Sequence, residues 1–442
     1  MARTLLIALL LATPLLAAPT PPEEKPKPRA KLLGTVKLDK IVIEVCWTPD
    51  AKHLILITDE KGLVIGRDQI GEDAPIKPIA EFALPVGGTC KFGMTPDGTE
   101  LYAMVTARRI NAETRLCYWT LKDLLDGKKK AKPDRVVSLE VDKPSTFALS
   151  ADGRSLYTVV SEPRRGGLLP PNGLRPQIGK VLRSSTKTGD IAEEWMPLDL
   201  PNATLVGAAV HTVSGKVFAH FQTAEEHVVR CFDRAGKKEK WERTFPQPLP
   251  NGNVGDGPKV SPDGRVVVAY WSRQFSTVQP GAVPQPGQPP PLVAVYTNCP
   301  QLLNATNGEV IADLGGDDVY NSEVIDFSPD SKLMFGWLNR PGGIQSVVWE
   351  TKTGKALKAW NRGSGDLTAA FAPGRHELAI VEHTTHNSNP SHLTPERIHG
   401  GILMETDGAD LQYIRNVFRQ QRVPRVEEES IIGVWDLAPL VK

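Results

Sequence analysis

The sequence predicts an all-β fold, a seven-bladed β-propeller of four-stranded antiparallel blades. First, a Ser-Pro-Asp-Gly type turn between two apolar runs, as in "KVSPDGRVVVAYW", recurs along the chain. Second, most copies are followed by another pair of β-runs around a Gly-containing turn, as in "VVWETKTGKALKAW". Third, a hydrophobic content of 40% is enough for a sizeable core. Pro presets φ and Gly tolerates positive φ, so each turn predicts a hairpin.

The repeat has seven copies, each predicting four strands, which we call A, B, C and D in chain order. The aligned turn positions are Asp50, Asp97, Asp152, Ser214, Asp263, Asp330 and Gly374. Three segments lack the pattern: 163–178, 273–299 and 385–429. Without them the unit length falls close to the ~40–45 residues of one propeller blade. This arithmetic favours seven blades over the alternative of eight.

The end of the chain carries the most specific motif. In "IIGVWDL", Trp435 and Asp436 stand at the end of an expected strand C, and "VVWE" (Trp349, Glu350) repeats the pattern imperfectly. The chain therefore resembles WD-repeat or related YVTN-type propellers, although the Gly-His pair typical of that family is missing. Only "APLVK" follows "IIGVWDL". We expect "KLLGTVKL", residues 31–38, to supply the missing strand D and close the ring, as the resemblance also implies.

The N-terminus predicts export. Residues 1–18 have the charge, apolar run and small residues of a signal peptide, and 19–30 form a Pro-rich linker before a propeller over 31–442. A retained N-terminal anchor is the alternative. After cleavage no transmembrane segment is expected, so the predicted location is secreted, periplasmic or associated with the cell envelope.

Charge and cysteine content exclude some functions. Lys plus Arg number 52 against 51 for Asp plus Glu, so no global charge attracts the chain to nucleic acid. The five cysteines are Cys46, Cys90, Cys117, Cys231 and Cys299. None belongs to a Cys-x-x-Cys pair, so no disulfide or redox motif is assigned.

The three long segments all follow an expected strand B and precede a strand C. They therefore decorate one face of the disk, which we predict to be the working face, because long loops on a rigid scaffold usually carry function or are disordered. Exposed decoration without a partner is the alternative. The candidate binding residues on this face are Arg164, Arg165, Arg175, Arg415 and Arg419.

The third segment contains the remaining candidate chemistry. His383, just before this segment, and His386, His392 and His399 within it form a cluster that is a candidate zinc or copper site, against the alternative of an exposed polar loop. Its part "ILMETDGADLQYI" favours an extra hairpin over a short amphipathic helix. If that hairpin were the true C–D pair of its blade, the expected ring closure would fail.

No nucleophile elbow, zinc-protease motif or phosphate-binding loop occurs, and no cofactor is expected. The leading hypothesis is an exported, non-catalytic propeller that binds a protein, peptide or glycan through the face bearing the long segments. The alternative is a YVTN-like lactonase or a quinoprotein-type enzyme with a site in the central channel. A third hypothesis is a purely structural component of the envelope.

Overall fold

The fold is described from a computed structural model. The described residues run from 29 to 441. The gaps within this range are 59, 72–75, 86–87, 108–113, 129–131, 142–143, 164–176, 199–202, 224–225, 234–238, 247–256, 279–291, 317–318, 320, 341–342, 363–366 and 387–426.

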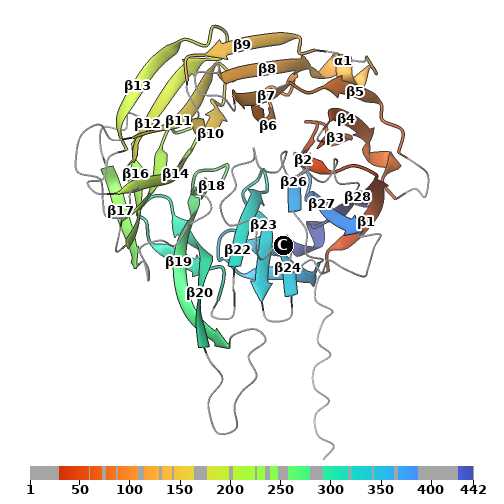
Figure 1. Ribbon diagram of the computed structural model, residues 1–442. Coiled ribbons are helices and arrows are strands. Elements are labelled where there is room, and N and C mark those ends of the chain that lie inside the picture. Colours follow the sequence, from red (N-terminus) through yellow and green to blue (C-terminus); the bar gives the residue numbers. More distant parts are fainter. Residues whose placement is uncertain are drawn as a thin grey trace, which may run out of the picture.

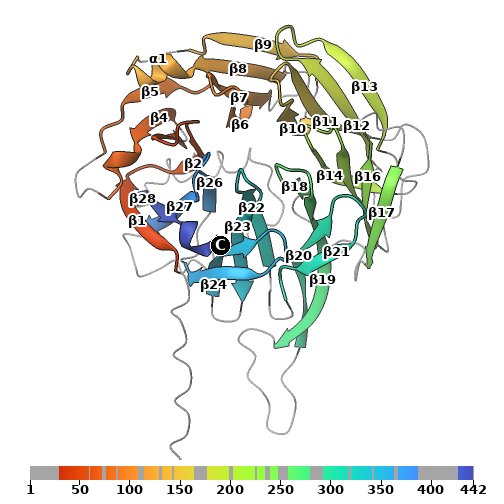
Figure 2. The ribbon, with the colours of Figure 1, turned by 180° about the vertical axis from the view of Figure 1, so that it is seen from behind.

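Seven four-stranded sheets are arranged in a ring (Figures 1 and 2), so the predicted seven-bladed propeller is confirmed. Blade 1 consists of β2 (Val42–Trp47), β3 (His53–Thr58), β4 (Lys61–Gly66) and β5 (Ala80–Ala83). Blade 2 consists of β6 (Gly88–Met94), β7 (Glu100–Ala107), β8 (Thr114–Thr120) and β9 (Arg135–Leu139). Blade 3 consists of β10 (Pro144–Leu149), β11 (Ser155–Pro163), β12 (Gln177–Ser185) and β13 (Ile191–Leu198).

Blade 4 consists of β14 (Thr204–Val210), β15 (Val217–Gln222), β16 (Glu226–Phe232) and β17 (Glu239–Pro246). Blade 5 consists of β18 (Lys259–Val260), β19 (Val266–Val278), β20 (Leu292–Asn304) and β21 (Val310–Asp313). Blade 6 consists of β22 (Asn321–Phe327), β23 (Leu333–Arg340), β24 (Gly343–Glu350) and β25 (Ala356–Asn361). Blade 7 consists of β26 (Leu367–Phe371), β27 (Glu377–His386), β28 (Glu427–Asp436) and β1 (Lys31–Leu38). The helical elements are η1 (Arg67–Gln69), α1 (Leu121–Leu125) and η2 (Ala438–Leu440).

One backbone hydrogen bond closes every A–B turn, which explains the repeated sequence motif. In blade 5 the Ser261 amide donates to the Val266 carbonyl at 3.0 Å, and the same bond recurs at the equivalent place in all seven blades. The Ser261 hydroxyl donates to Asp263 at 2.7 Å and accepts from the Val266 amide. Gly264 has φ +68°, a conformation in which a Cβ is unfavourable. Ser-x-Asp-Gly is therefore turn chemistry, as predicted.

The chain ends close the ring, as predicted. Strand β1 pairs with β28 from Lys31 opposite Asp436 to Leu38 opposite Ser430. Strand β28 is strand C of blade 7, because it also pairs with β27. The "IIGVWDL" motif is thus the real strand C, and every blade has four strands.

The hydrophobic core is divided among the seven seams between adjacent blades. The seam between blades 4 and 5, for example, combines Phe218 and Phe245 of blade 4 with Val267 and Leu303 of blade 5. The strands A form the innermost circle, where β2 contacts β26 and β6, and β22 contacts β26 (Figure 1). Each blade therefore buries apolar surface only against its two neighbours, so the closed ring leaves no blade half-covered.

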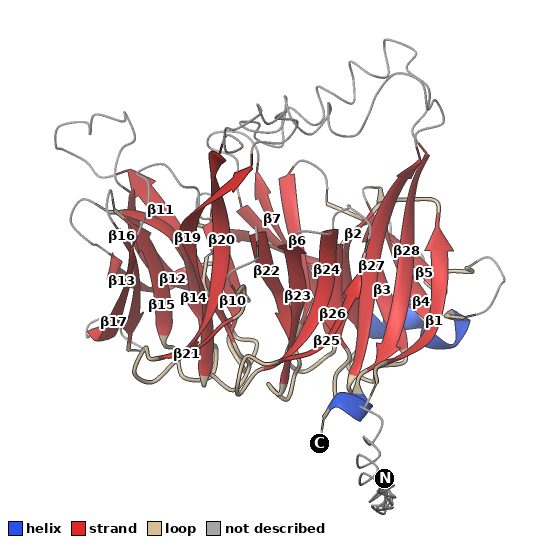
Figure 3. Ribbon diagram, turned by 90° about the horizontal axis from the view of Figure 1, so that it is seen from below, coloured by secondary structure: helices blue, strands red, loops and turns tan. Residues whose placement is uncertain are grey.

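The antiparallel meander places the A–B and C–D turns on one side of the disk, which we call the turn face. The B–C and D–A connections lie on the opposite side, which we call the B–C face; Figure 3 shows the short turns on one side and the ends of β19, β20, β27 and β28 on the other. Among the described residues, no helix has the length and apolar character needed to cross a membrane.

Candidate functional site

Three blades have longer B–C ladders than the others. Strands B and C have nine residues each in blade 3, thirteen each in blade 5 and ten each in blade 7. In the other four blades these strands have six to eight residues. The three blades are those in which the sequence carries its long B–C segments. The scaffold is thus extended on the B–C face where the chain has its additional residues.

Blade 5 carries the longest extension. Strands β19 and β20 pair continuously from Val266 opposite Asn304 to Val278 opposite Leu292. Strand β18 pairs only as far as Val268, and β21 pairs only with 301–303. Over 272–278 and 292–298, no third strand among the described residues joins this two-stranded ribbon. Within the described part of the chain, the backbone groups along both edges of this ribbon therefore have no partner strand.

The long segments predicted from the sequence are only partly described. Within 273–299, residues 273–278 and 292–299 lie in the strands of the ribbon, and 279–291 lie outside the described residues. Segment 163–178 begins at the end of β11 and ends at the start of β12. Arg164, Arg165, Arg175, Arg415 and Arg419 lie outside the described residues, as do 387–426, where a hairpin and a helix were the alternatives.

The predicted histidine cluster is described at two of its four positions. His383 lies in β27 opposite Ser430, and the His383 Nδ1 atom is 3.1 Å from the Ser430 hydroxyl oxygen. His386 ends β27, while His392 and His399 lie outside the described residues. Within the part of the chain that is described, no three His, Cys, Asp or Glu residues form a group suited to a metal ion. The histidine site therefore stays a prediction from the sequence.

Two partly buried carboxylates lie on the inner strands, and sequence reasoning missed both. Glu44 in β2 accepts a hydrogen bond from the Phe92 amide of blade 2 at 2.9 Å. Asp326 in β22 accepts one from the Phe371 amide of blade 7 at 3.3 Å. Burial raises the pKa of Glu44 to about 7 and that of Asp326 to about 6, although these amides favour the ionised forms. The signal for Glu44 was an acidic residue inside the otherwise apolar strand VIEVCW, whereas Asp326 lies in the mixed strand NSEVIDF, which gave no such signal.

These carboxylates join neighbouring blades. Each one reaches from the strand A of its own blade to the strand A of the next. Lys259 does the same from blade 5, donating to the Val324 carbonyl of blade 6 at 2.6 Å and to Glu323 at 3.3 Å. The two acids lie on blades 1 and 6 and each is engaged with a different neighbour. Their geometry thus accounts for cohesion of the ring rather than for paired acid–base chemistry.

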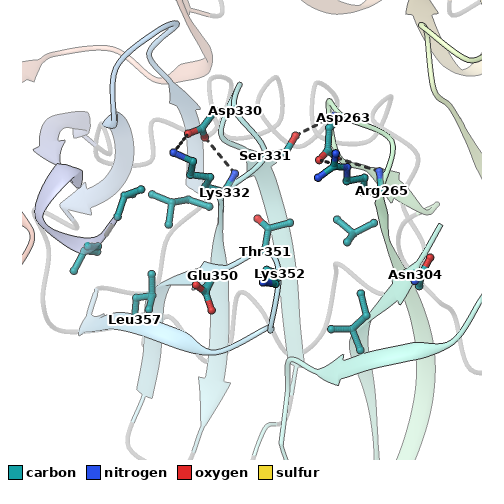
Figure 4. A pocket seen from close by; sticks show the side chains of 15 residues that line it. Asp263, Arg265, Asn304, Asp330, Ser331, Lys332, Glu350, Thr351, Lys352 and Leu357 are labelled. Atoms are coloured by element: carbon teal, nitrogen blue, oxygen red, sulfur yellow. Dashed lines mark hydrogen bonds and ion pairs between the residues drawn. The ribbon is translucent and has the colours of Figure 1, made fainter. Parts of the chain in front are cut away.

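A cavity of about 730 Å³ lies on the turn face at the end of blade 6 (Figure 4). Four of its charged groups pair within their own turns: Arg265 lies 3.6 Å from Asp263, and Lys332 lies 3.4 Å from Asp330. The Asp263 amide donates to the Ser331 hydroxyl of the neighbouring blade at 3.0 Å. The cavity is therefore bounded by turn chemistry that the fold itself uses.

The chain was also compared with known proteins. No family model matches, and no curated protein matches. Among solved structures, hydrazine synthase of Kuenenia stuttgartiensis is similar with a TM-score of 0.50 and 16% identity, covering 78% of this chain and 94% of that chain. The Cps50 (Swd1) β-propeller domain of Myceliophteria thermophila has a TM-score of 0.48 and 8% identity, covering 79% of this chain and 96% of that chain. At these identities the likeness concerns the fold alone. The chain is a seven-bladed β-propeller, the fold that its sequence resemblance implied.

Proposed function

We propose that the protein is an exported interaction scaffold that binds a protein, peptide or glycan through its B–C face. The single observation that carries this proposal is the length of the B–C ladders in blades 3, 5 and 7. Among the described residues, the outer parts of these ladders pair only between strands B and C. A rigid platform with extended strands on one side suits recognition of a partner.

The ribbon of blade 5 is the strongest part of the proposed surface. Residues 272–278 and 292–298 read "SRQFSTV" and "LVAVYTN", with Arg273 as the one charged residue. Exposed edges of strands are usually protected by Lys, Pro or charged residues. A ribbon with a single charged residue, and with its edges open among the described residues, supports a role in binding an extended chain by strand addition.

Quantitative capture from envelope extracts of the source cells tests this proposal. The full chain is compared with a variant in which residues 274–296 are replaced by Asn-Gly, and with the turn-face control Arg265→Glu/Lys332→Glu. A partner that binds the full chain and the control, but binds the shortened variant at least tenfold more weakly when both proteins are purified, supports the proposal. Glycan arrays probed with the same three proteins test the glycan alternative.

The opposite pattern contradicts the proposal. A partner that is lost in the turn-face control and retained by the shortened variant would assign recognition to the turn face. Export is tested separately by fusing residues 1–30 to an alkaline phosphatase that is active only outside the cytoplasm. An inactive fusion would contradict the proposed location.

A further inference from the structure

The seam between blades 4 and 5 contains a residue that departs from the repeat. The hydrogen bond that closes each A–B turn aligns the seven strands B. We compare one position in each strand B, four residues after the residue whose carbonyl accepts this bond. The residues at this position are Ile57, Met104, Val159, His220, Tyr270, Trp337 and Val381. Four of these side chains are apolar. Hydrogen bonds satisfy two others, because the Tyr270 hydroxyl pairs with both the amide and the carbonyl of Val324, and the Trp337 indole donates to Glu323.

His220 has a different partner. Its Nε2 atom lies 3.3 Å from Nδ1 of His227 on the adjacent strand β16, and the ring centroids are 5.2 Å apart. Both side chains are fully buried. The two remaining ring nitrogens, Nδ1 of His220 and Nε2 of His227, have no hydrogen-bond partner. Each unpaired buried polar group costs about 1–3 kcal/mol, so Ile or Val at this place would be more stable in the absence of a ligand.

The surroundings keep both imidazoles neutral. Burial lowers the pKa of His220 to about 3, with the neighbouring His227 as the second cause, and burial lowers the pKa of His227 to about 4. Phe245 lies directly opposite His227 on β17, and Phe218 and Val229 belong to the same seam core. Since a metal binds only the unprotonated nitrogen, such rings are ready to ligate at neutral pH without competition from protons.

The blade 5 side of this seam also contains unpaired polar atoms. The Trp271 indole nitrogen and the Gln301 side-chain oxygen are buried without a partner. Gln301 faces the seam because it alternates along β20 with Leu303, which belongs to the seam core. The seam therefore contains polar groups on both of its sides.

We propose that His220 Nε2 and His227 Nδ1 form a two-coordinate site for a monovalent copper ion between blades 4 and 5. The neutral pair holds two protons, one between the rings and one on an outer nitrogen. When Cu(I) takes the place between the rings, the shared proton moves to the free outer nitrogen. Both rings then carry one proton, no proton is released, and no bond other than this N–H is broken.

The donor set selects the ion. Imidazole nitrogen is a good ligand for copper, whereas Mg²⁺ and Ca²⁺ require oxygen ligands and Zn²⁺ is almost always four-coordinate in structural sites. Among the described residues, no third His, Cys, Asp or Glu joins the pair. A single positive charge between two neutral donors also places less charge in an apolar seam than a divalent ion would. Cu(I), a d¹⁰ ion that accepts linear coordination by two ligands, therefore fits the pair of imidazoles best.

The test is an anaerobic competition titration with Cu(I) bicinchoninate. Copper is supplied to the folded protein and during refolding, because both rings are buried. The wild type is compared with His220→Val/His227→Val and with a matched control, His383→Ala/His386→Ala/His392→Ala/His399→Ala. We expect one equivalent of Cu(I) bound by the wild type and by the control, and its complete loss in the His220/His227 variant.

The outcome is decisive in each arm. Absence of bound copper in the wild type, retention of copper by the His220/His227 variant, or its loss in the control would each overturn the proposal. If the double valine variant does not fold, copper X-ray absorption on the wild type decides, with two nitrogen ligands expected and three or more contradicting the site. A larger increase in Tm with Zn²⁺ than with Cu(I) would also overturn the two-coordinate assignment.

Discussion

The two sides of the disk use their polar groups differently. On the turn face the same backbone hydrogen bond closes all seven A–B turns, and five of them add a Ser or Thr hydroxyl bonded to an Asp. Toward the B–C face the blades diverge, since their ladders range from six to thirteen residues. Equivalent positions carry residues as different as His220 and Tyr270. Uniform chemistry indicates a folding requirement, and divergence indicates where function can be accommodated.

The largest expected effect is on the pH dependence of stability, which differs between the buried histidines and the carboxylates of the turn face. The pKa of each buried histidine is lower in the folded protein than in the unfolded chain, so the unfolded chain binds protons first as pH falls below about 6.5. The free energy of unfolding therefore decreases in that range. This amounts to about 2 kcal/mol per histidine at pH 5. Glu44 and Asp326, with raised pKa values, act in the opposite sense between pH 7 and 4. The wild type must therefore be compared with a variant.

We expect His220→Val/His227→Val to gain about 4 kcal/mol relative to the wild type between pH 7 and pH 5. Metal-free urea unfolding at both pH values measures this difference. The turn carboxylates provide the contrast, because hydrogen bonds from Thr95 and Ser150 lower the pKa of Asp97 and Asp152. Their contribution is present above the ordinary Asp pKa and disappears only as pH falls through the folded value. A difference between wild type and variant that does not change with pH would contradict the account of the pair.

Exchanging side chains at the two equivalent positions of strand B gives the next effect. Tyr270→Phe removes the hydroxyl that accepts from the Val324 amide, while Lys259 still donates to the Val324 carbonyl, and should cost about 2 kcal/mol. His220→Val/His227→Val removes both imidazoles together, so neither ring is left without its partner, and should be neutral or stabilising without metal at pH 7. Chemical denaturation of both variants measures these changes. Equal losses in the two would show that the position, and not its partner groups, determines stability.

A smaller effect is expected in the turns. Ser261→Ala removes a fully buried hydroxyl that bonds both Asp263 and the Val266 amide, and should cost about 1 kcal/mol. Blade 7 has Ala372 at this place and keeps the backbone bond, so Ala372→Ser is the matched control, with little change expected. Thermal unfolding compares the two. A fully stable Ser261→Ala would mean that the backbone bond alone holds the turn.

The smallest effect concerns the surface charges of the turn face. Arg265 and Lys332 are mostly exposed beside Asp263 and Asp330, so Arg265→Ala/Lys332→Ala should change stability by less than about 0.5 kcal/mol. Binding of a partner should be unchanged as well. A marked loss of binding in this variant, measured by calorimetry, would assign function to the turn face.

The sequence predicted what repeats and missed what occurs once. The Ser-Pro-Asp-Gly turns, seven blades and the pairing of 31–38 with the last strand C follow from local turn chemistry and from the need to close a ring. The Asp326 and Glu44 contacts depend on register between blades, which no local pattern encodes. His220 and His227 lie within one blade, are separated by a turn, and meet because β15 and β16 pair. The candidate arginines lie outside the described residues and stay predictions.

The most direct test of the division between the two faces is hydrogen exchange with and without a purified bound partner. We predict new protection in the amides of 272–278 and 292–298, with no change in the A–B turns around Asp97, Asp263 and Asp330. Protection confined to those turns, with the ribbon unchanged, would contradict the assignment of function to the B–C face.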